Sequence, residues 1–109
     1  MKTLRWAVPL LACVAACGGS AVPRLTAADA SRGSAHFPNL TLNELAQGRT
    51  LYVSRCGSCH TLKSPVELAP EQWQVEVGEM RAKNGVKLSD TEAQAIVRYL
   101  AVAAGASSG

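Results

Sequence analysis

The chain has 109 residues, of which 48% are hydrophobic, so it is long enough for one small domain. Its formal net charge is +3, and no run of like charge or basic patch with interleaved aromatic residues indicates a nucleic-acid partner. Aromatic residues make up only 5% of the chain, and a core of this size is marginal without an additional staple.

Residues 1–16 have the features of an export signal. Lys2 and Arg5 supply the positive charge, and an apolar run from position 6 to position 16 follows. That run is too short to span a bilayer as a permanent helix. We therefore expect a mature chain outside the cytoplasm.

The signal ends in Val14-Ala15-Ala16-Cys17, which resembles the lipobox of bacterial lipoproteins, where the cysteine is lipidated and becomes the first residue. Ordinary cleavage after a small-residue triplet is the alternative. We favour lipidation of Cys17, because Gly18-Gly19-Ser20 follows as a flexible linker. The resemblance implies the periplasmic side of a bacterial cell envelope and, because no Asp follows Cys17, is compatible with an outer-membrane destination.

Residues 17–39 are rich in Ala, Ser, Gly and Pro and show no sustained hydrophobic period. This composition predicts a flexible tether between the lipid anchor and a domain spanning residues 40–104.

The first predicted helix of that domain runs from Leu42 to about Arg55. Thr41 and Glu44 form a capping box at its start. Gly48 lies inside the helix, where glycine costs about 1 kcal/mol relative to alanine. We expect a second helix to cross closely at Gly48, although a neutral surface position is the alternative.

Cys56-Gly57-Ser58-Cys59-His60 is the attachment sequence for c-type haem. Two cysteines three positions apart can each add across one haem vinyl group to form a thioether, and His60 can then bind the iron. The small residues between the cysteines let the backbone approach the porphyrin edge.

A redox dithiol, a zinc site and an iron–sulfur cluster are the competing interpretations of the cysteine pair. A thioredoxin-like dithiol requires a βαβ context, and the other two require four ligands, whereas no Cys or His follows His60. The two remaining cysteines, Cys13 and Cys17, lie in the signal, so none is left for a disulfide. We therefore predict one covalent haem c per chain.

Residues 61–69 contain Pro65 and no clear period. His60 needs an acceptor for its other ring nitrogen, and a backbone carbonyl in this loop, such as that of Pro65, is the natural candidate.

The second predicted helix runs from Pro70 to about Lys83 and ends at Asn84-Gly85. It places Trp73, Val77 and Met80 on one face. We expect Trp73 to line the haem pocket by packing, or to donate its indole N–H to a propionate.

Met80 is the only methionine outside the signal. A thioether ligand raises the haem potential and favours electron transfer over gas binding, so we predict that Met80 is the second iron ligand. The alternative is that Met80 only fills core space. His36, the other histidine, lies in the predicted tether and is more often solvated than ligating in such a segment.

The last predicted helix runs from Asp90 to about Ala104. Ser89 and Glu92 form a second capping box, and a frayed tail is expected over residues 105–109. Its apolar face consists of Ala93, Ile96, Val97 and Leu100, with Tyr99 flanking it.

Together these residues resemble the small class I cytochromes c of bacteria, from about Leu40 to Ala103. The resemblance implies an all-α fold with about three main helices around one haem, in which the first and last helices cross at Gly48 and Tyr52 meets the Tyr99 region. The chain lacks the Gly-Pro-x-Leu stretch after the haem histidine and the Met-Pro loop of the best-known members. It is similar instead to shorter domains with a Trp…Met helix.

We therefore expect an electron carrier rather than an enzyme, with redox proteins as partners and a larger oxidase or dehydrogenase as a possible host. The iron ligands would be His60 and Met80, and Cys56 and Cys59 would hold the haem. The alternative is a five-coordinate haem protein that binds or reduces NO, CO or peroxide. A haem-free anchored scaffold is a third hypothesis.

Overall fold

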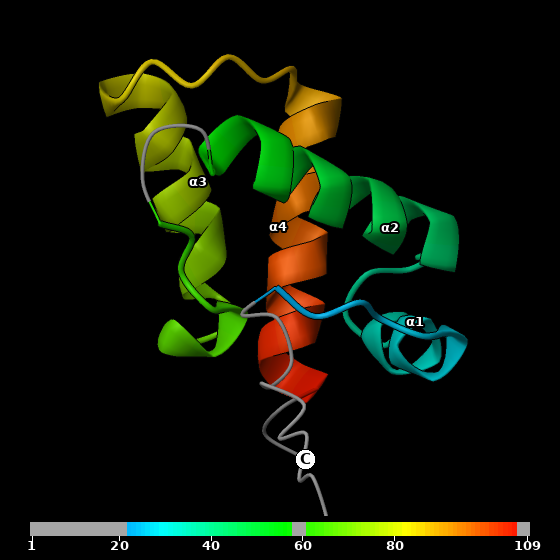
Figure 1. Cartoon of the computed structure of the whole chain (residues 1–109). Coiled ribbons are helices and arrows are strands. Elements are labelled where there is room, and N and C mark those ends of the chain that lie inside the picture. The colour runs from blue at the N-terminus through cyan, green and yellow to red at the C-terminus, as the bar shows by residue number, and fades with distance from the viewer. Residues whose placement is uncertain (1–21, 58–60, 107–109) are drawn as a thin grey trace, which may run out of the picture.

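Helix α4 (Asp90–Ala106) lies at the centre of the computed structural model, which describes residues 22–57 and 61–106 (Figure 1). Around it pack α1 (Ala27–Gly33), α2 (Leu42–Leu51) and α3 (Gln72–Lys83). The described ranges contain no strand, which confirms the predicted all-α class and is consistent with a small cytochrome c fold. None of the helices within them is long and apolar enough to cross a membrane.

Helices α2 and α4 cross at Gly48, as predicted. A Cβ atom at Gly48 would lie 2.8 Å from the Cβ of Tyr99 and would overlap the carbonyl group of Ala95. Only glycine therefore lets the two helix backbones approach this closely. Beside the crossing, Arg98 of α4 pairs with Glu44 of α2 at 3.0 Å.

The core follows the apolar face of α4. Ile96, Tyr99 and Leu100 are fully buried, and Leu45 of α2 and Trp73 of α3 close over them. Burying a side chain of this size contributes roughly 1.5–3 kcal/mol, so this layer supplies most of the drive for folding. The apolar face predicted for the last helix is confirmed, with Val97 only half-buried.

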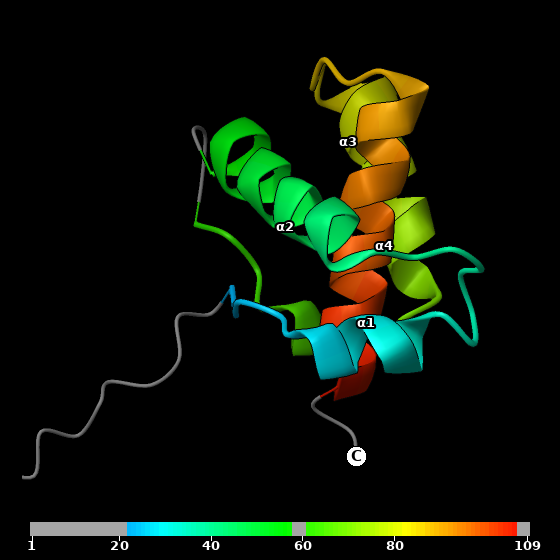
Figure 2. The same cartoon turned by 90° about the vertical axis from the view of Figure 1, so that its right-hand side faces the viewer.

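Residues 22–39 are not the flexible tether that their composition predicted. Thr26 and Asp29 form a capping box that begins α1, and Gly33 of that helix packs against Val102 of α4. Figure 2 shows α1 lying across the C-terminal half of α4. The buried residues of α1 itself are small, Ala30 and Gly33, so the helix gives no hydrophobic period that the sequence could show.

The extended segment before α1 is fixed by side chains of the core helices. Arg49 donates from Nε to the carbonyl oxygen of Val22 at 3.0 Å, and the Tyr99 hydroxyl donates to the carbonyl oxygen of Pro23. The folded domain thus includes Val22, and the predicted start at residue 40 is wrong. The signal, Cys17 and residues 107–109 lie outside the described residues.

The predicted helix boundaries shift near the haem motif. The helix expected to reach Arg55 becomes a π-helical turn, η1 (Tyr52–Cys56), after Leu51. A 3-10 turn, η2 (Pro65–Glu67), follows the motif, and α3 begins at Gln72 rather than at Pro70. Such π turns widen a helix locally, and here the turn contains the first cysteine of the motif.

Candidate functional site

Cys56 is the cysteine of the predicted haem motif that the structure describes. It lies at the end of η1 with 8% of its surface exposed, and it forms no disulfide. Burial raises the pKa of its thiol, so the free thiol stays neutral. Cys59 and His60 lie outside the described residues.

Cys56 and Met80 line the same small apolar cavity. Its volume is about 30 Å³, and it lies between η1, the segment after the motif, α3 and the connection to α4. The residues that line it are Tyr52, Cys56, Lys63, Trp73, Glu76, Val77, Met80 and Leu88. The structure therefore brings together Cys56, Trp73 and Met80, three of the residues predicted to contact the cofactor.

The chemistry of this lining fits a haem. A buried thiol and a thioether face an almost entirely apolar surface, which suits a macrocycle held by a covalent bond and a soft ligand. The cavity alone is smaller than the roughly 300–1,000 Å³ of a typical cofactor site. Leu88, however, also lines an open groove of about 730 Å³. The Leu88 side chain therefore lies between the small cavity and this groove.

Trp73 packs at the site but does not offer its N–H to it. Its Nε1 donates to the carbonyl oxygen of Pro65 at 2.8 Å, and the side chain is 2% exposed. The indole N–H therefore already has an acceptor within the chain, and a role of Trp73 at a haem stays a prediction. The Pro65 carbonyl, which we considered as the acceptor for His60, already accepts from Trp73.

Tyr52 connects the two sides of the haem motif. Its hydroxyl donates to the carbonyl oxygen of Lys63 at 2.8 Å, and its ring meets the edge of Trp73 with centroids 6.1 Å apart. Burial, and secondarily the nearby Cys56, raise the pKa of Tyr52 to about 12. The sequence marked Tyr52 as a helix-packing residue and gave no signal for this hydrogen bond.

Met80 lies half-buried near the end of α3, on the face that it shares with Trp73 and Val77, as predicted. Its sulfur is 3.0 Å from Nδ2 of Asn84, which donates to it. A thioether sulfur is a weak acceptor with two lone pairs, so one remains for a metal. Ligation of iron by Met80 stays a prediction.

His36 does not line the cavity. It is exposed in the turn after α1, where its backbone N–H bonds to the carbonyl of Gly33. Within the described ranges, no group of three or more His, Cys, Asp and Glu side chains could hold a metal.

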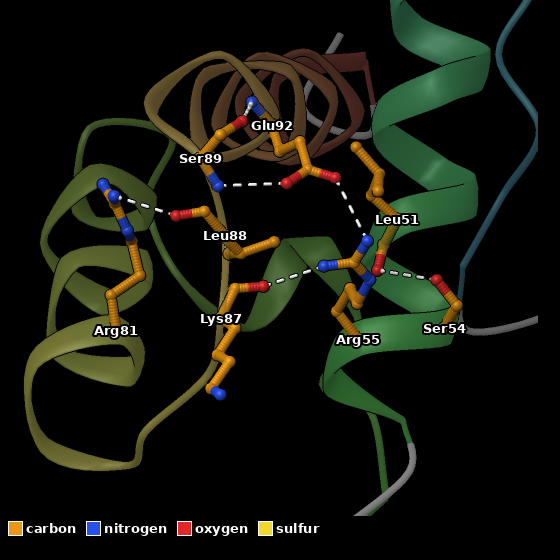
Figure 3. A network of polar contacts seen from close by, with 8 residues as sticks. All are labelled: Leu51, Ser54, Arg55, Arg81, Lys87, Leu88, Ser89 and Glu92. Atoms are coloured by element: carbon orange, nitrogen blue, oxygen red, sulfur yellow. Dashed lines mark hydrogen bonds and ion pairs between the residues drawn. The ribbon is translucent and has the colours of Figure 1, made fainter.

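Sequence reasoning missed two arginines beside the site. Arg55 directly precedes Cys56, and Arg81 directly follows Met80. Both bind the connection between α3 and α4 (Figure 3). The one sequence signal that could have identified these arginines was their position next to residues predicted to bind the cofactor.

Comparison with known proteins adds a family. The profile described as "Quinohemoprotein amine dehydrogenase A, alpha subunit, haem binding" matches residues 46–109, more than half of the chain. A search of curated proteins found no match, and a search of solved structures found none. The matched range begins within α2 and contains the haem motif and Met80. The chain therefore belongs to the family of haem-binding domains described for the alpha subunit of quinohemoprotein amine dehydrogenase A.

Proposed function

We propose that this protein is an exported c-type cytochrome that carries single electrons between redox proteins. One haem would be joined to Cys56 and Cys59 by thioethers, with His60 and Met80 as iron ligands. The observation that carries this proposal is that Cys56 and Met80, from separate elements, line one buried apolar cavity in a member of a haem-binding family.

A haem bound here would supply a reversible one-electron change at iron. The residues of the chain set its surroundings. Trp73, Tyr52 and Leu88 give the cavity an apolar wall that excludes water and favours the less charged, reduced state. The Trp73–Pro65 and Tyr52–Lys63 hydrogen bonds fix that wall, which keeps structural rearrangement small when the charge changes.

We also infer a partner class. The family is named after a subunit of a dehydrogenase, so this chain would accept electrons from such an enzyme, as a subunit or as a docking partner. On this proposal the dehydrogenase performs the substrate oxidation, and the present chain carries the electrons away.

We propose further that lipid on Cys17 anchors the protein on the periplasmic side of the cell envelope. Because the folded domain includes Val22, only five residue steps separate it from the anchor, at most about 18 Å of extended chain. This reach is much shorter than the tether predicted from composition. Mass spectrometry of the mature N-terminus tests the anchor, and Cys17→Ser should release the protein from membranes.

The central test uses the mature protein from a host with haem-maturation machinery. We expect the colour to survive denaturation and acid–acetone extraction, since thioethers are covalent. The parent should show the ferric Met–iron charge-transfer band, and Met80→Ala should lose it. A parent that is already high-spin and is unchanged by Met80→Ala would contradict electron transfer by this ligand set and favour the binding of NO, CO or peroxide.

A further inference from the structure

Two arginines hold the connection between α3 and α4 from opposite sides, as Figure 3 shows. We call Arg55 and Arg81 the arginine pair. Nη1 of Arg55 donates to the carbonyl oxygen of Lys87 at 2.8 Å, and its Nη2 contacts the carboxylate of Glu92 at 3.1 Å. One guanidinium thus binds the connection and the first turn of α4 at once.

Arg81 repeats this pattern with the neighbouring residues. Its Nη2 donates to the carbonyl oxygen of Leu88 at 3.0 Å and contacts the carboxylate of Asp90 at 3.0 Å. The two guanidinium groups therefore bind consecutive carbonyls, Lys87 and Leu88. Planar guanidinium groups suit this task because their several N–H donors diverge in fixed directions.

The start of α4 holds the carboxylate that Arg55 uses. Oε1 of Glu92 accepts from the backbone N–H of Ser89 at 3.0 Å, which leaves Oε2 for Arg55. The backbone N–H of Glu92 in turn contacts the Ser89 hydroxyl at 3.1 Å. The capping box therefore orients the acceptor for Arg55.

The same connection reaches the proposed haem site at both ends. At its start, Asn84 donates to the sulfur of Met80 at 3.0 Å, and the backbone N–H of Val86 bonds to the Met80 carbonyl at 3.2 Å. At its end, Leu88 lines the cavity together with Cys56 and Met80. A shift of Leu88 would thus uncover the cavity, whereas Asn84 is also tied to α3 by its own backbone N–H, which bonds to the Met80 carbonyl at 3.2 Å.

Stability alone is a weak reason for this arrangement. The side chains of Arg55 and Arg81 are 42% and 35% exposed, and ion pairs at such positions contribute little to folding. Charge-assisted hydrogen bonds to backbone carbonyls, by contrast, fix geometry. The main effect of the arginine pair is thus to fix the position of the connection between α3 and α4.

We propose that Arg55 and Arg81 are positioning residues for the haem site. They hold the connection so that Leu88 stays over the cavity that Met80 lines, and a haem bound there would be shielded from external ligands that compete with Met80. This inference rests on the proposed function, because it requires Met80 to be an iron ligand.

The test measures how easily an external ligand displaces Met80 in the ferric holoprotein. Imidazole is the probe, at neutral pH, and the midpoint potential is the second measurement. Arg55→Gln and Arg81→Gln should each tighten imidazole binding by roughly tenfold, the effect of losing a hydrogen bond from a charged group. Both should lower the potential, because water reaches a less covered site.

Arg55→Lys and Arg81→Lys keep the charge but not the divergent donors. Their imidazole affinity should therefore lie between those of the parent and the glutamine variants. If the glutamine variants do not fold, the lysine variants provide the same test. Arg98→Gln is the matched control, since Arg98 pairs with Glu44 of α2 at 3.0 Å and does not line the cavity. It should lower the thermal midpoint and leave imidazole affinity unchanged.

Two results would overturn the inference, and they differ in what else they affect. If the parent shows the Met–iron band but the variants of the arginine pair bind imidazole no better than Arg98→Gln, the positioning role fails and the proposed function survives. If the parent lacks that band, the proposed function fails and the positioning role fails with it.

Discussion

The two ends of α4 are supported by different chemistry. Its C-terminal half is enclosed by apolar contacts, with Tyr99 and Leu100 fully buried beneath α2 and Val102 packed against Gly33 of α1. Its N-terminal end is held by exposed groups, namely the Ser89–Glu92 capping box and the arginine pair. The cavity with Cys56 and Met80 lies nearer this polar end.

This difference separates the residues that stabilise the domain from those that set the geometry of the cavity site. Burial of large side chains contributes several kcal/mol in total, whereas exposed ion pairs contribute little. Changes at the apolar crossing should therefore unfold the domain, while changes at the polar end should alter the site within a folded protein. The following predictions test this division, beginning with the largest effect.

Gly48→Ala should destabilise the protein most, by about 3 kcal/mol. The new Cβ would meet the carbonyl of Ala95 and lie 2.8 Å from the Cβ of Tyr99, so the helices must separate. Denaturant unfolding measures the loss. Gly78→Ala is the matched control, because a Cβ there meets nothing within 4 Å, and it should stabilise α3 by about 0.5–1 kcal/mol. Equal effects of the two substitutions would refute the close crossing.

Trp73→Phe should cost about 2 kcal/mol. It removes the donor to the buried Pro65 carbonyl, which is then left without its partner, and it shrinks the packed ring. Because Trp73 also lines the cavity, the midpoint potential should shift in the folded protein. A potential identical to that of the parent would place Trp73 in the core alone.

Tyr52→Phe should cost about 1 kcal/mol at neutral pH, the typical effect of losing one hydrogen bond. It should also change the alkaline behaviour. The folded pKa of Tyr52 is about 12, above the model-peptide value of about 10, so the stability that this residue contributes is complete below about pH 10. It is lost as the pH rises towards 12, because the unfolded phenol ionises first. Unfolding of parent and variant across this window should therefore converge.

The elements of this fold that rest on local signals could be read from the sequence. The caps at Thr41 and Ser89 and the apolar face of α4 predicted two helices, although the Glu44 carboxylate pairs with Arg98 instead of completing the first capping box. The glycine at position 48 predicted their crossing, and the Trp73–Met80 spacing placed both side chains on one cavity. Each of these signals lies within a few residues of the feature that it describes.

The features that sequence reasoning missed depend on distant partners. Helix α1 is fixed by contacts of its small residues with α4, and a stretch rich in alanine and glycine gives no sign of them. The arginine pair binds backbone carbonyls of Lys87 and Leu88, and every residue has such a carbonyl. Likewise, the Trp73 indole found its acceptor at Pro65, which no spacing rule specifies.

Acid should affect the polar end of α4 more subtly than any of the substitutions above. Hydrogen bonds from Ser89, and secondarily the charge of Arg55, hold the pKa of Glu92 below its usual value. The contribution of the ionised carboxylate is thus present above the usual glutamate pKa and is lost as the pH falls through the lowered one. We expect the Met–iron band of the ferric protein to weaken in this range before the helices unfold.

Glu92→Gln should already show the weaker band at neutral pH and should lack the acid-dependent step, because its side chain cannot ionise. Glu71→Gln, at the exposed start of α3, removes the same charge and should retain the step. If the band and the helical signal disappear together in the parent, the polar end does not adjust the site independently of folding. The proposed separation of the two ends of α4, one stabilising the fold and the other adjusting the site, would then be wrong, because both ends would unfold as one cooperative unit.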